Sequence, residues 1–461
     1  MPHAALREVL AAAGLEGAAQ SAVEIRGDDP VLPIRYRVAA AASASLAALG
    51  VAAARLHPEP QRISIDARAA AISLRSATYL RVDGKPLPPV WDLLSGFYPV
   101  KDGWVSIHCN FPNHREAALR VLGTEPDRMK AEAASASWSG EALEDAIHAA
   151  GGCAGYVRSE EQWLGHPQAQ AVANQPLLEI VRIGDAPPWQ PIPGARPLSR
   201  VRVLDLTRVL AGPTCAKSLA EHGADVLKIS AAHLPHSGLV ELDTGIGKRS
   251  AYVDLRNNKG VDTLRTLVAR AHVFSQSYRP GALDRRGFSP EDLAGLRPGM
   301  VCASLSAWGE SGPWRGRRGF DSIVQAVSGM AQAEQGDSGS GARPRLLPVS
   351  AIDYVSGYLM AFGVCVALGR RRVQGGSWLV RVGLARVGKW IVDRGVLPES
   401  AWRGVPEDLP EEELQPLLGE IDAPDGRIRY LKPVVQLSET PAFWTRPPVP
   451  LGYHPPVWTF A

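Results

Sequence analysis

Short apolar runs alternate with helical stretches between residues 201 and 306, and this alternation limits the folds open to the chain. Strands are expected at 201–206, 224–229, 251–255, 273–276 and 301–306. Helices are expected between them, at about 211–222, 260–271 and 290–296. Because parallel strands need crossover connections, this order predicts an α/β fold with an open, Rossmann-like parallel sheet and helices on both faces. Ligands in such sheets bind at the carboxyl ends of the strands.

The remaining segments predict a smaller α+β domain before this sheet and a C-terminal segment that wraps over the rest. Residues 97–100 and 104–108 flank a turn and are expected to form a hairpin, and 114–180 is mainly helical by composition. The Pro-rich stretch 185–197 is the strongest linker candidate. From about residue 400 the chain is again rich in Pro and shows little regular pattern.

Composition excludes several classes of protein. Of the 461 residues, 45% are hydrophobic and 21% are charged, which rules out a disordered or fibrous chain. A formal net charge of +3 disfavours binding of nucleic acid through bulk charge. The five cysteines form no CxxC pair, which argues against a disulfide framework or a structural zinc site and fits a reducing, cytoplasmic location. The N-terminus lacks the pattern of a secretory signal.

Two apolar stretches, 38–54 and 354–369, are each shorter than the roughly 18–20 residues that cross a bilayer, so we expect buried core helices and no membrane partner. They also belong to two similar parts of the sequence. Leu32-Pro33, the first stretch and a strand at 63–66 follow the same order as Leu347-Pro348, the second stretch and a strand at 378–381. Either part of one unit is present twice, or two Ala-, Leu- and Val-rich helices coincide by chance.

Six blocks between residues 200 and 370 are far more specific together than any one of them alone. They are RVLDLTRVLAGP (202–213), LAEHGADVLKI (219–229), GKRSAYVDL (247–255), YRPGALDRRG (278–287), SLSAWGESGP (304–313) and GFDSIVQA (319–326). In this order and spacing they resemble the class III CoA-transferase family, the group of formyl-CoA transferase and carnitine CoA-transferase. The resemblance implies a transferase that moves CoA from an acyl-CoA donor to a small carboxylic acid. It implies CoA and acyl-CoA as substrates, no permanently bound cofactor and no metal.

The order of the parts departs from the family, because the piece that resembles its small domain, around 98–104, precedes the 201–353 block. The resemblance divides the chain into five units. They are a helical lead-in (1–30), a partial, degenerate copy with the small-domain-like region (31–184), a Pro-rich linker (185–200), a CoA-binding domain with the catalytic Asp (201–375), and a helix with the wrapping segment (376–461). Family members usually form intertwined dimers, so the resemblance also implies a homodimer.

Asp353 matches the position of the family's nucleophile, an Asp just before an apolar helix. A carboxylate there attacks the thioester to give a mixed anhydride, and the released CoA thiolate converts this into an aspartyl-CoA thioester. A helix N-terminus steadies such negative charge. Without the resemblance, a helix N-cap is the simpler interpretation of Asp353. The first copy has Val38, Ala39 and Ala40 at the corresponding place and is expected to be catalytically empty.

The resemblance also assigns residues that contact CoA. They are Val209, Leu210, Ala211, Val253, Asp254, Leu255, Arg256, Ser277, Tyr278, Arg285, Ser306, Ala307, Trp308 and Gly309. Arg285 is expected to face the CoA phosphates, since a guanidinium suits bidentate contact with phosphate. Leu210 and Ser277 replace the family's usual Gln and Asn, and no Glu follows Ile229 where the family places one near the adenine.

Two alternatives remain at this point. Acyl-CoA racemases share the fold and use a His that would fall at Phe320, whose side chain cannot accept a proton, so this activity is disfavoured. A non-catalytic homologue that binds CoA, or a partner subunit, is favoured by the rearranged order and by the missing Gly-rich flap of the small domain.

Overall fold

A seven-stranded sheet is the largest element of the computed structural model, which describes residues 1–17, 23–192, 194–334 and 342–459. Its order is β11-β10-β9-β12-β13-β14-β8. The strands are β8 (Glu179–Gly184), β9 (Arg202–Leu206), β10 (Asp225–Ser230), β11 (Lys248–Tyr252), β12 (Val273–Gln276), β13 (Val301–Ser306) and β14 (Ser377–Gly383). Strands β9 to β14 run parallel, and β8 is antiparallel to β14 at one edge. The predicted α/β class is confirmed.

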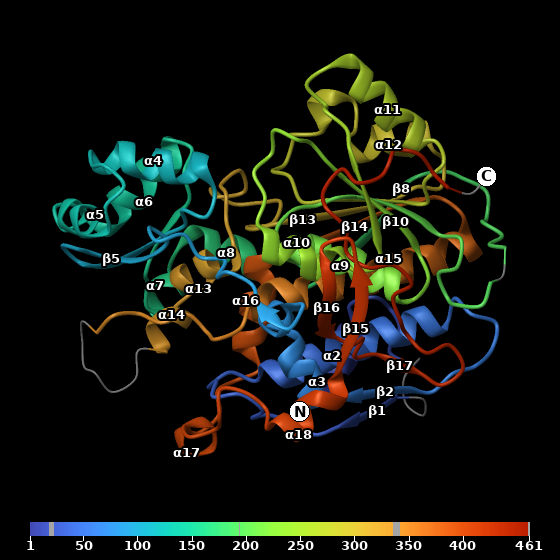
Figure 1. Cartoon of the computed structure of the whole chain (residues 1–461), viewed down its shortest axis with the longest axis horizontal. Coiled ribbons are helices and arrows are strands. Elements are labelled where there is room, and N and C mark those ends of the chain that lie inside the picture. The colour runs from blue at the N-terminus through green and yellow to red at the C-terminus, as the bar shows by residue number, and fades with distance from the viewer. Residues whose placement is uncertain (18–22, 193, 335–341, 460–461) are drawn as a thin grey trace.

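Each side of this sheet has its own core, because successive residues of a strand point to opposite faces. Val203, Val226 and Val273 face a core shared with α9 (Ala211–Glu221) and α15 (Ala351–Gln374). Their neighbours Leu204, Leu227 and Phe274 face a second core shared with α11 (Asn258–Val268) and α12 (Pro290–Leu296). Figure 1 shows α11 and α12 above the sheet and α15 below it. The predicted helices on both faces are therefore present.

The strand order creates a switch point. Counted along the chain from β9, the parallel strands follow the order 3-2-1-4-5-6, and β9 lies beside β12. In doubly wound sheets the connections leave such a strand pair toward opposite faces, which opens a crevice at the carboxyl ends of the two strands. In this chain those ends are residues 207–211 and 277–280.

The N-terminal part forms a second, smaller helix–strand unit. It comprises α1 (Pro2–Ala11), β1 (Val23–Arg26), α2 (Val38–Ala54), β2 (Ile63–Asp66) and α3 (Ala67–Ser73). β1 pairs in parallel with β2, so the expected helical lead-in over 1–30 is wrong at 23–26; residues 18–22 lie outside the described part of the chain. The short strand alternates partly buried and exposed residues, and only four residues carry this signal.

The α2–β2 unit repeats the geometry of the α15–β14 unit. Gly50 and Gly363 each lie twelve residues after the first residue of their helix. A Cβ on Gly50 would lie 2.8 Å from Ile63 of β2, and a Cβ on Gly363 would lie 2.6 Å from Val380 of β14. Both helices therefore need a glycine where they press on the strand that follows them. The internal similarity of the sequence corresponds to two similarly built helix–strand units.

The two units exchange their edge strands. β8, which precedes the Pro-rich segment, pairs antiparallel with β14 of the second unit, and β17 (Gln436–Leu437) near the C-terminus pairs antiparallel with β2 of the first. The equivalence extends to side chains, since Gly363 approaches Leu178 just before β8 and Gly50 approaches Val435 just before β17. The main sheet thus contains strands from residues 31–184, 201–375 and 376–461.

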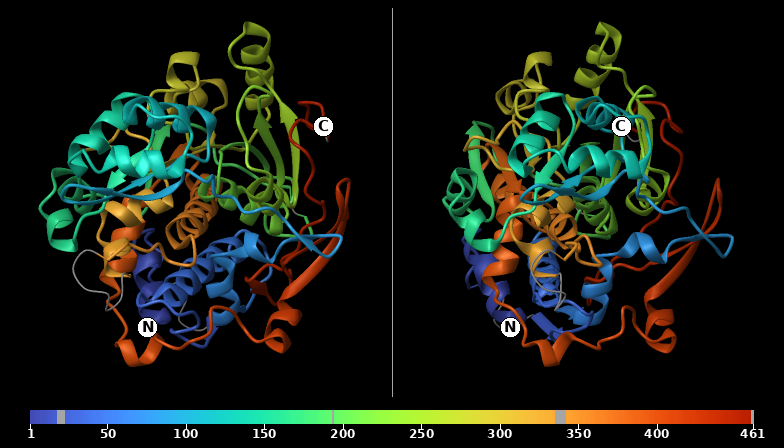
Figure 2. Two further views of the ribbon diagram at one scale, coloured as in Figure 1. Left: turned by 60° about the vertical axis from the view of Figure 1, so that its left-hand side comes forward. Right: turned by 90° about the vertical axis from the view of Figure 1, so that its left-hand side faces the viewer.

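A separate lobe precedes β8, on the left of Figure 1 and forward in Figure 2. It is built from β5 (Gly96–Val100), β6 (Gly103–Ile107), α4 (Pro112–Leu122), α5 (Arg128–Ser135), α6 (Gly140–Ala149), β7 (Ala154–Tyr156), α7 (Glu160–Leu164) and α8 (Pro167–Ala173). β5 and β6 pair antiparallel around Lys101-Asp102, which confirms the predicted hairpin. The predicted small α+β domain is this lobe.

The C-terminal segment has more regular structure than its Pro-rich sequence predicts. After α16 (Leu384–Asp393) and two single-turn helices, α17 (Glu399–Trp402) and α18 (Glu411–Leu414), it forms a hairpin of β15 (Leu418–Ala423) and β16 (Gly426–Leu431). β16 pairs with β3 (Arg81–Val82), which pairs with β4 (Lys85–Pro86). The remaining helices are α10 (Gly238–Gly245), α13 (Asp321–Val327), α14 (Met330–Ala333) and three 3₁₀ turns, Ser76–Tyr79, Asp284–Arg286 and Gln415–Leu417.

Both apolar stretches form buried helices, as predicted. α15 has 24 residues, longer than the expected apolar stretch, and among the described helices it alone is long and apolar enough to cross a membrane. Its whole apolar window is buried within the fold. All five cysteines are free and buried.

Candidate active site

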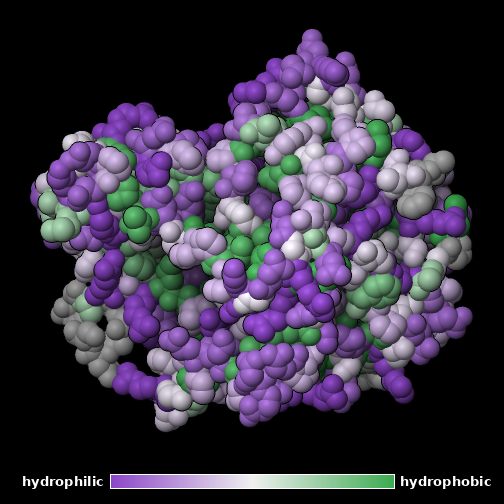
Figure 3. Space-filling model, in the orientation of Figure 1, coloured by the Kyte–Doolittle hydropathy of each residue, from purple (hydrophilic) through white to green (hydrophobic). Residues whose placement is uncertain are grey.

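The switch point opens into a cavity of about 550 Å³. Its walls include Arg208 to Ala211 after β9, Ser277 to Pro280 after β12, and Leu305 to Ala307 at the end of β13. These three segments are the carboxyl ends of adjacent parallel strands, so the cavity lies where ligands bind in sheets of this order. Figure 3 shows a hollow with apolar residues at its base between the small lobe and the main body.

The loop after β9 is held from below by a buried ion pair. Asp205 accepts a hydrogen bond from the Thr207 amide at 3.0 Å, and Lys248 on β11 lies 2.7 Å from the other oxygen of Asp205. Lys248 also donates to the carbonyl of Pro213 at 2.8 Å. Burial lowers the pKa of Lys248 to about 8, with Asp205 opposing that shift. Two buried charges thus fix the backbone that approaches the cavity.

Val209, at the centre of this loop, has a left-handed backbone with φ of 67°. A β-branched residue rarely adopts this conformation, and its cost is of order 1–3 kcal/mol. The surrounding contacts keep it in place. Gly212 lies so close to Thr207 that a Cβ would approach it to 2.4 Å. Strained backbone of this kind is concentrated at ligand sites.

Asp353 occupies the third position of α15 and is 7% exposed, on the wall of the cavity. The N-cap of the helix is Ser350, so Asp353 is not the cap. Gly357, one turn further along, lets α15 press on the loop after β9, since a Cβ there would lie 2.5 Å from the carbonyl of Ala211. No hydrogen bond to the Asp353 carboxylate is present among the described residues. Its oxygens are therefore free to meet a ligand.

Asp321 positions the start of α15. This residue, the first of α13, accepts a hydrogen bond from the backbone N–H of Asp353 at 3.0 Å. Gln325 donates to its other oxygen at 2.5 Å and accepts from the N–H of Leu347 at 2.8 Å. Burial raises the pKa of Asp321 to about 6. Burial, and then the charge of Asp321, raise the pKa of Asp353 well above its usual value.

The cavity at the switch point, named the basic cavity here, has a strongly positive wall. Five arginines line it: Arg208, Arg279, Arg315, Arg317 and Arg318. Among its described lining residues, Asp353 is the only acidic side chain. Burial, reinforced by the charge of Arg279, lowers the pKa of Arg318. Neighbouring guanidinium groups with so few counter-charges favour an anionic ligand.

A second cavity of about 330 Å³ meets Asp353 from its other side. Val209, Leu210, Phe320 and Asp353 line both cavities. The wall of this second space, the acid cavity, comes from separate parts of the chain. Its apolar side chains include Val90, Trp91, Leu239, Val240, Leu346, Leu347 and Val349, and its polar ones include Arg75, His108, Asn110, Ser322 and Gln325. Asp353 therefore stands between a basic and a largely apolar space.

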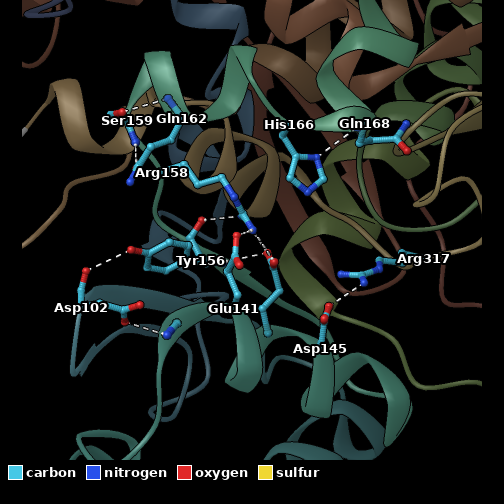
Figure 4. Close-up of polar contacts among 12 residues, drawn as sticks. Asp102, Glu141, Asp145, Tyr156, Arg158, Ser159, Gln162, His166, Gln168 and Arg317 are labelled. Atoms are coloured by element: carbon cyan, nitrogen blue, oxygen red, sulfur yellow. Dashed lines mark hydrogen bonds and ion pairs between the residues drawn. The ribbon is translucent and has the colours of Figure 1, made fainter.

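The small lobe supplies part of both cavities and is fixed against the main body by polar contacts (Figure 4). Arg317 of the basic cavity forms an ion pair with Asp145 of α6 at 2.6 Å. Gln168 of α8 donates to the carbonyls of Trp308 and Ser311, each at 3.0 Å. Arg158, after β7, is bound to Glu144 at 2.7 Å, and both side chains are 3% exposed. The contacts of Arg317 and Gln168 hold the loop after β13 against the lobe, whereas the Arg158–Glu144 pair lies within the lobe.

The structure brings together half of the residues assigned to CoA. Val209, Leu210, Ala211, Ser277, Tyr278, Ser306 and Ala307 line the basic cavity beside Asp353. Neither cavity is lined by Val253, Asp254, Leu255, Arg256, Arg285, Trp308 or Gly309. Arg285 is exposed in the 3₁₀ turn at Asp284–Arg286, Asp254 and Arg256 pair with each other at 2.7 Å, and Trp308 is buried. Phe320 lines both cavities, so the place of a racemase's base holds a ring without a proton acceptor.

The basic wall and the lobe residues were not predicted from the sequence. The cluster of three arginines at 315–318 was a visible signal, because charge concentrated after a predicted strand end indicates an anion site. His108, Phe111 and His114 carried no such signal, since only the docking of the lobe brings them to the cavities.

Comparison with known proteins bears on this geometry. Residues 198–416 match the model of CoA-transferase family III. The resemblance to the class III CoA-transferases is confirmed over that region. It contains Asp353, Asp321 and the loops of the switch point. The chain is 31% identical over 203 residues to the "Probable fatty acyl-CoA transferase Rv3272" of Mycobacterium tuberculosis, covering 41% of this chain and 51% of that protein. It is 33% identical over 184 residues to human succinyl-CoA:glutarate CoA-transferase, covering 37% and 41%.

Solved structures also match about half of this chain. The structure of Rv3272 in an orthorhombic form is 30% identical over 43% of this chain and 58% of that one, with a TM-score of 0.40. A CAIB/BAIF family protein from Brucella suis is 24% identical over 51% and 65%, with a TM-score of 0.40. This chain spans about half the length of the curated relatives it matches.

Proposed function

We propose that this protein is a CoA-transferase that moves CoA from an acyl-CoA to a carboxylic acid through covalent intermediates on Asp353. One observation carries the proposal: a buried carboxylate with no internal partner among the described residues lies between a basic cavity and an apolar one. The basic cavity suits the phosphorylated part of CoA, and the acid cavity suits the acyl group. The match to CoA-transferase family III supports the same assignment.

The first step is attack of an Asp353 carboxylate oxygen on the thioester carbon. The C–S bond breaks and CoA leaves as a thiolate, which gives a mixed anhydride between Asp353 and the acyl group. The thiolate then attacks the Asp353 carbonyl carbon and releases the first acid as a carboxylate. An incoming carboxylate attacks the resulting aspartyl-CoA thioester and expels CoA as a thiolate, which gives a second mixed anhydride. The thiolate then attacks the acyl carbon of the new acid, and the C–O bond to Asp353 breaks, which releases the new acyl-CoA and the free Asp353 carboxylate. No proton is gained or lost over the cycle.

The N-terminus of α15 contributes to each of these steps. The partial positive charge at the start of a helix stabilises negative charge that develops near it. Asp321 holds the backbone N–H of Asp353 itself, and so fixes the direction in which α15 begins. Its negative charge opposes ionisation of Asp353, whereas the arginines of the basic cavity favour it. Burial leaves the Asp353 carboxylate poorly solvated, and this keeps it reactive as a nucleophile.

The α2 unit serves as a scaffold in this proposal. Ala40, the third residue of α2, stands where Asp353 stands in α15 and has no nucleophile.

We further propose that the protein acts in the cytoplasm and pairs with a second copy, which light scattering at several concentrations would test. A non-catalytic CoA-binding role is the second candidate, because Arg285 and residues 253–256 lie outside both cavities.

The test is intact-protein mass spectrometry with a panel of acyl-CoAs in the presence of hydroxylamine. Hydroxylamine converts an activated carboxyl into a hydroxamate. We expect a mass increase on the peptide that contains Asp353, and none in Asp353→Ala. A protein that binds CoA in calorimetry but gives no adduct with any donor would instead be the non-catalytic homologue.

A further inference from the structure

A cluster of five rings separates the two cavities. His108, at the end of β6, lies parallel to Phe320 with ring centroids 3.8 Å apart and planes 6° apart. Trp91 meets the other side of the cluster with its edge, 6.2 Å from His108. Phe111 and His114 complete it, at 5.9 and 6.0 Å from His108. The small lobe thus presses an imidazole against the residue that precedes Asp321.

His108 is the polar member of this cluster that lines the acid cavity together with Asp353. Its backbone N–H donates to the carbonyl of Cys153 at 3.0 Å, which fixes the residue at the strand end. His108 is 5% exposed, and its Nδ1 is buried without a hydrogen-bond partner among the described residues. Buried polar atoms are usually paired, so the hydrogen-bonding capacity of this ring is not used up within the protein. The same holds for Nδ1 of His114, which lines the basic cavity instead.

The imidazole is uncharged under physiological conditions. Burial, with a smaller contribution from His114, lowers the pKa of His108 to about 3. A neutral ring carries one N–H and one lone pair. Nδ1 is the ring nitrogen that is buried without a partner, so Nε2 is the nitrogen that a ligand in the acid cavity can reach, and in one of the two neutral tautomers it carries the N–H. His108 therefore offers a hydrogen-bonding ring to a cavity whose wall is partly apolar and also includes the polar side chains of Arg75, Asn110 and Gln325.

We propose that His108 is a specificity-determining residue, whose Nε2–H donates a hydrogen bond to an oxygen atom on the acyl group bound beside Asp353. The favoured substrates are then hydroxy or oxo acids with an apolar body, rather than plain hydrocarbon acids. This inference rests on the proposed transfer reaction at Asp353. A site built around a hydrogen-bonding group rejects analogues without the partner, since both groups would otherwise be left unpaired.

The experiment compares acyl-CoA pairs that differ by one oxygen: butyryl with 2-hydroxybutyryl and 3-hydroxybutyryl, and phenylacetyl with mandelyl. The rate of hydroxamate formation on Asp353 is measured for wild type, His108→Phe and His108→Gln. The Phe variant keeps a ring against Phe320 and removes the donor, whereas Gln restores a donor. We expect wild type to prefer an oxygenated member roughly 10-fold or more, His108→Phe to abolish that preference, and His108→Gln to recover part of it.

His114→Phe is the matched control, because it removes an imidazole from the same ring cluster but on the side of the basic cavity. Whatever it does to the rate, the ratio between the members of each pair should stay as in wild type. A wild-type enzyme without preference in every pair, or a preference that survives in His108→Phe, overturns the inference.

Failure of the proposed function is distinguishable. If no donor modifies Asp353, the same free acids are titrated into protein with nitrogen-15-labelled histidine, and the ring signals that vanish in His108→Phe are followed. A shift with the oxygenated acid alone supports the role of His108 in a binding protein. The absence of any shift overturns it.

Discussion

In both the α2 and the α15 unit, a carboxylate accepts hydrogen bonds from the first turn of the helix, but only the α15 unit also carries a candidate nucleophile. Asp29 accepts hydrogen bonds from the N–H groups of Ala39 and Ala40, each at 2.8 Å. Asp321 does the same for Asp353. Burial raises the pKa of both capping carboxyls to about 6. The third helical residue is Ala40 in one unit and Asp353 in the other.

This difference separates what the fold needs from what the reaction needs. A distant carboxylate that satisfies the first N–H groups of a buried apolar helix is present in both units, so it is part of the architecture. The cavities and the second carboxylate occur at α15, where the small lobe and the switch point also meet. The following substitutions test whether the two units can be told apart in this way.

The largest expected effect is on transfer activity, and it distinguishes Asp353 from Asp29. Replacing Asp353 by Ala should lower transfer on the order of 10³-fold or more, since no other group can form the covalent intermediate. Asp29→Ala, in the α2 unit, should leave transfer within a few-fold of wild type at a temperature where both variants are folded. Steady-state rates and circular dichroism would check this. Comparable losses in both variants would mean that the units do not differ in chemistry.

The second prediction concerns stability against pH in the α2 unit. Asp29 has a folded-state pKa of about 6 against 3.8 when unfolded, so the folded state holds its proton more tightly. This contribution is fully present below pH 4 and is lost as the pH rises toward 6. Because Asp29 is partly exposed, we expect about 1–3 kcal/mol. Denaturant unfolding at pH 4.5 and 7 should show a smaller difference in Asp29→Asn than in wild type.

The third prediction uses the pH dependence of activity. The charge of Asp321 is one cause of the raised pKa of Asp353, after burial. Asp321→Asn keeps a hydrogen-bond acceptor at the start of α15 but removes this charge, so Asp353 should ionise more readily. The acidic limb of kcat/KM against pH should then move to lower pH, while Asp29→Asn should not move it. An unshifted limb in Asp321→Asn would show that the two carboxylates are uncoupled.

The smallest effect tests the structural equivalence of the units. Gly50→Ala and Gly363→Ala should each destabilise the protein, because the new methyl group meets Ile63 or Val380 at 2.8 or 2.6 Å. Overpacking costs typically 1–3 kcal/mol, and the better helix propensity of Ala returns up to about 1. Urea unfolding of both variants should give similar losses. A loss in one variant alone would show that the helix–strand contacts are not equivalent.

Much of the fold could be predicted because its signals are local. Strands β9, β10, β12 and β13 are largely buried on both faces, so short stretches rich in apolar residues mark them. β17 could not be found, since it has two residues and exists through its pairing with β2. The sequence could not identify β8 as the edge strand of the main sheet, because its place depends on pairing with β14, nearly two hundred residues later.

The site was predictable where one segment carries the signal and not where several segments meet. Asp353 and the loop after β9 could be located because family motifs surround them. Arg285 lies in a motif of the same kind, yet its 3₁₀ turn leaves it exposed and away from both cavities. The role of His108 could not be predicted from the sequence, because it depends on the packing of the lobe against the main body. This packing brings His108 to Phe320 and Asp353, which lie more than two hundred residues away in the chain.

The exchange of β8 and β17 has a consequence for how this gene can be divided. A break placed in the Pro-rich segment would yield two polypeptides, each lacking the strand that closes its own sheet and carrying the one that closes its partner's. Such fragments would be insoluble when expressed separately and would assemble when co-expressed, as the two subunits of a heterodimer do.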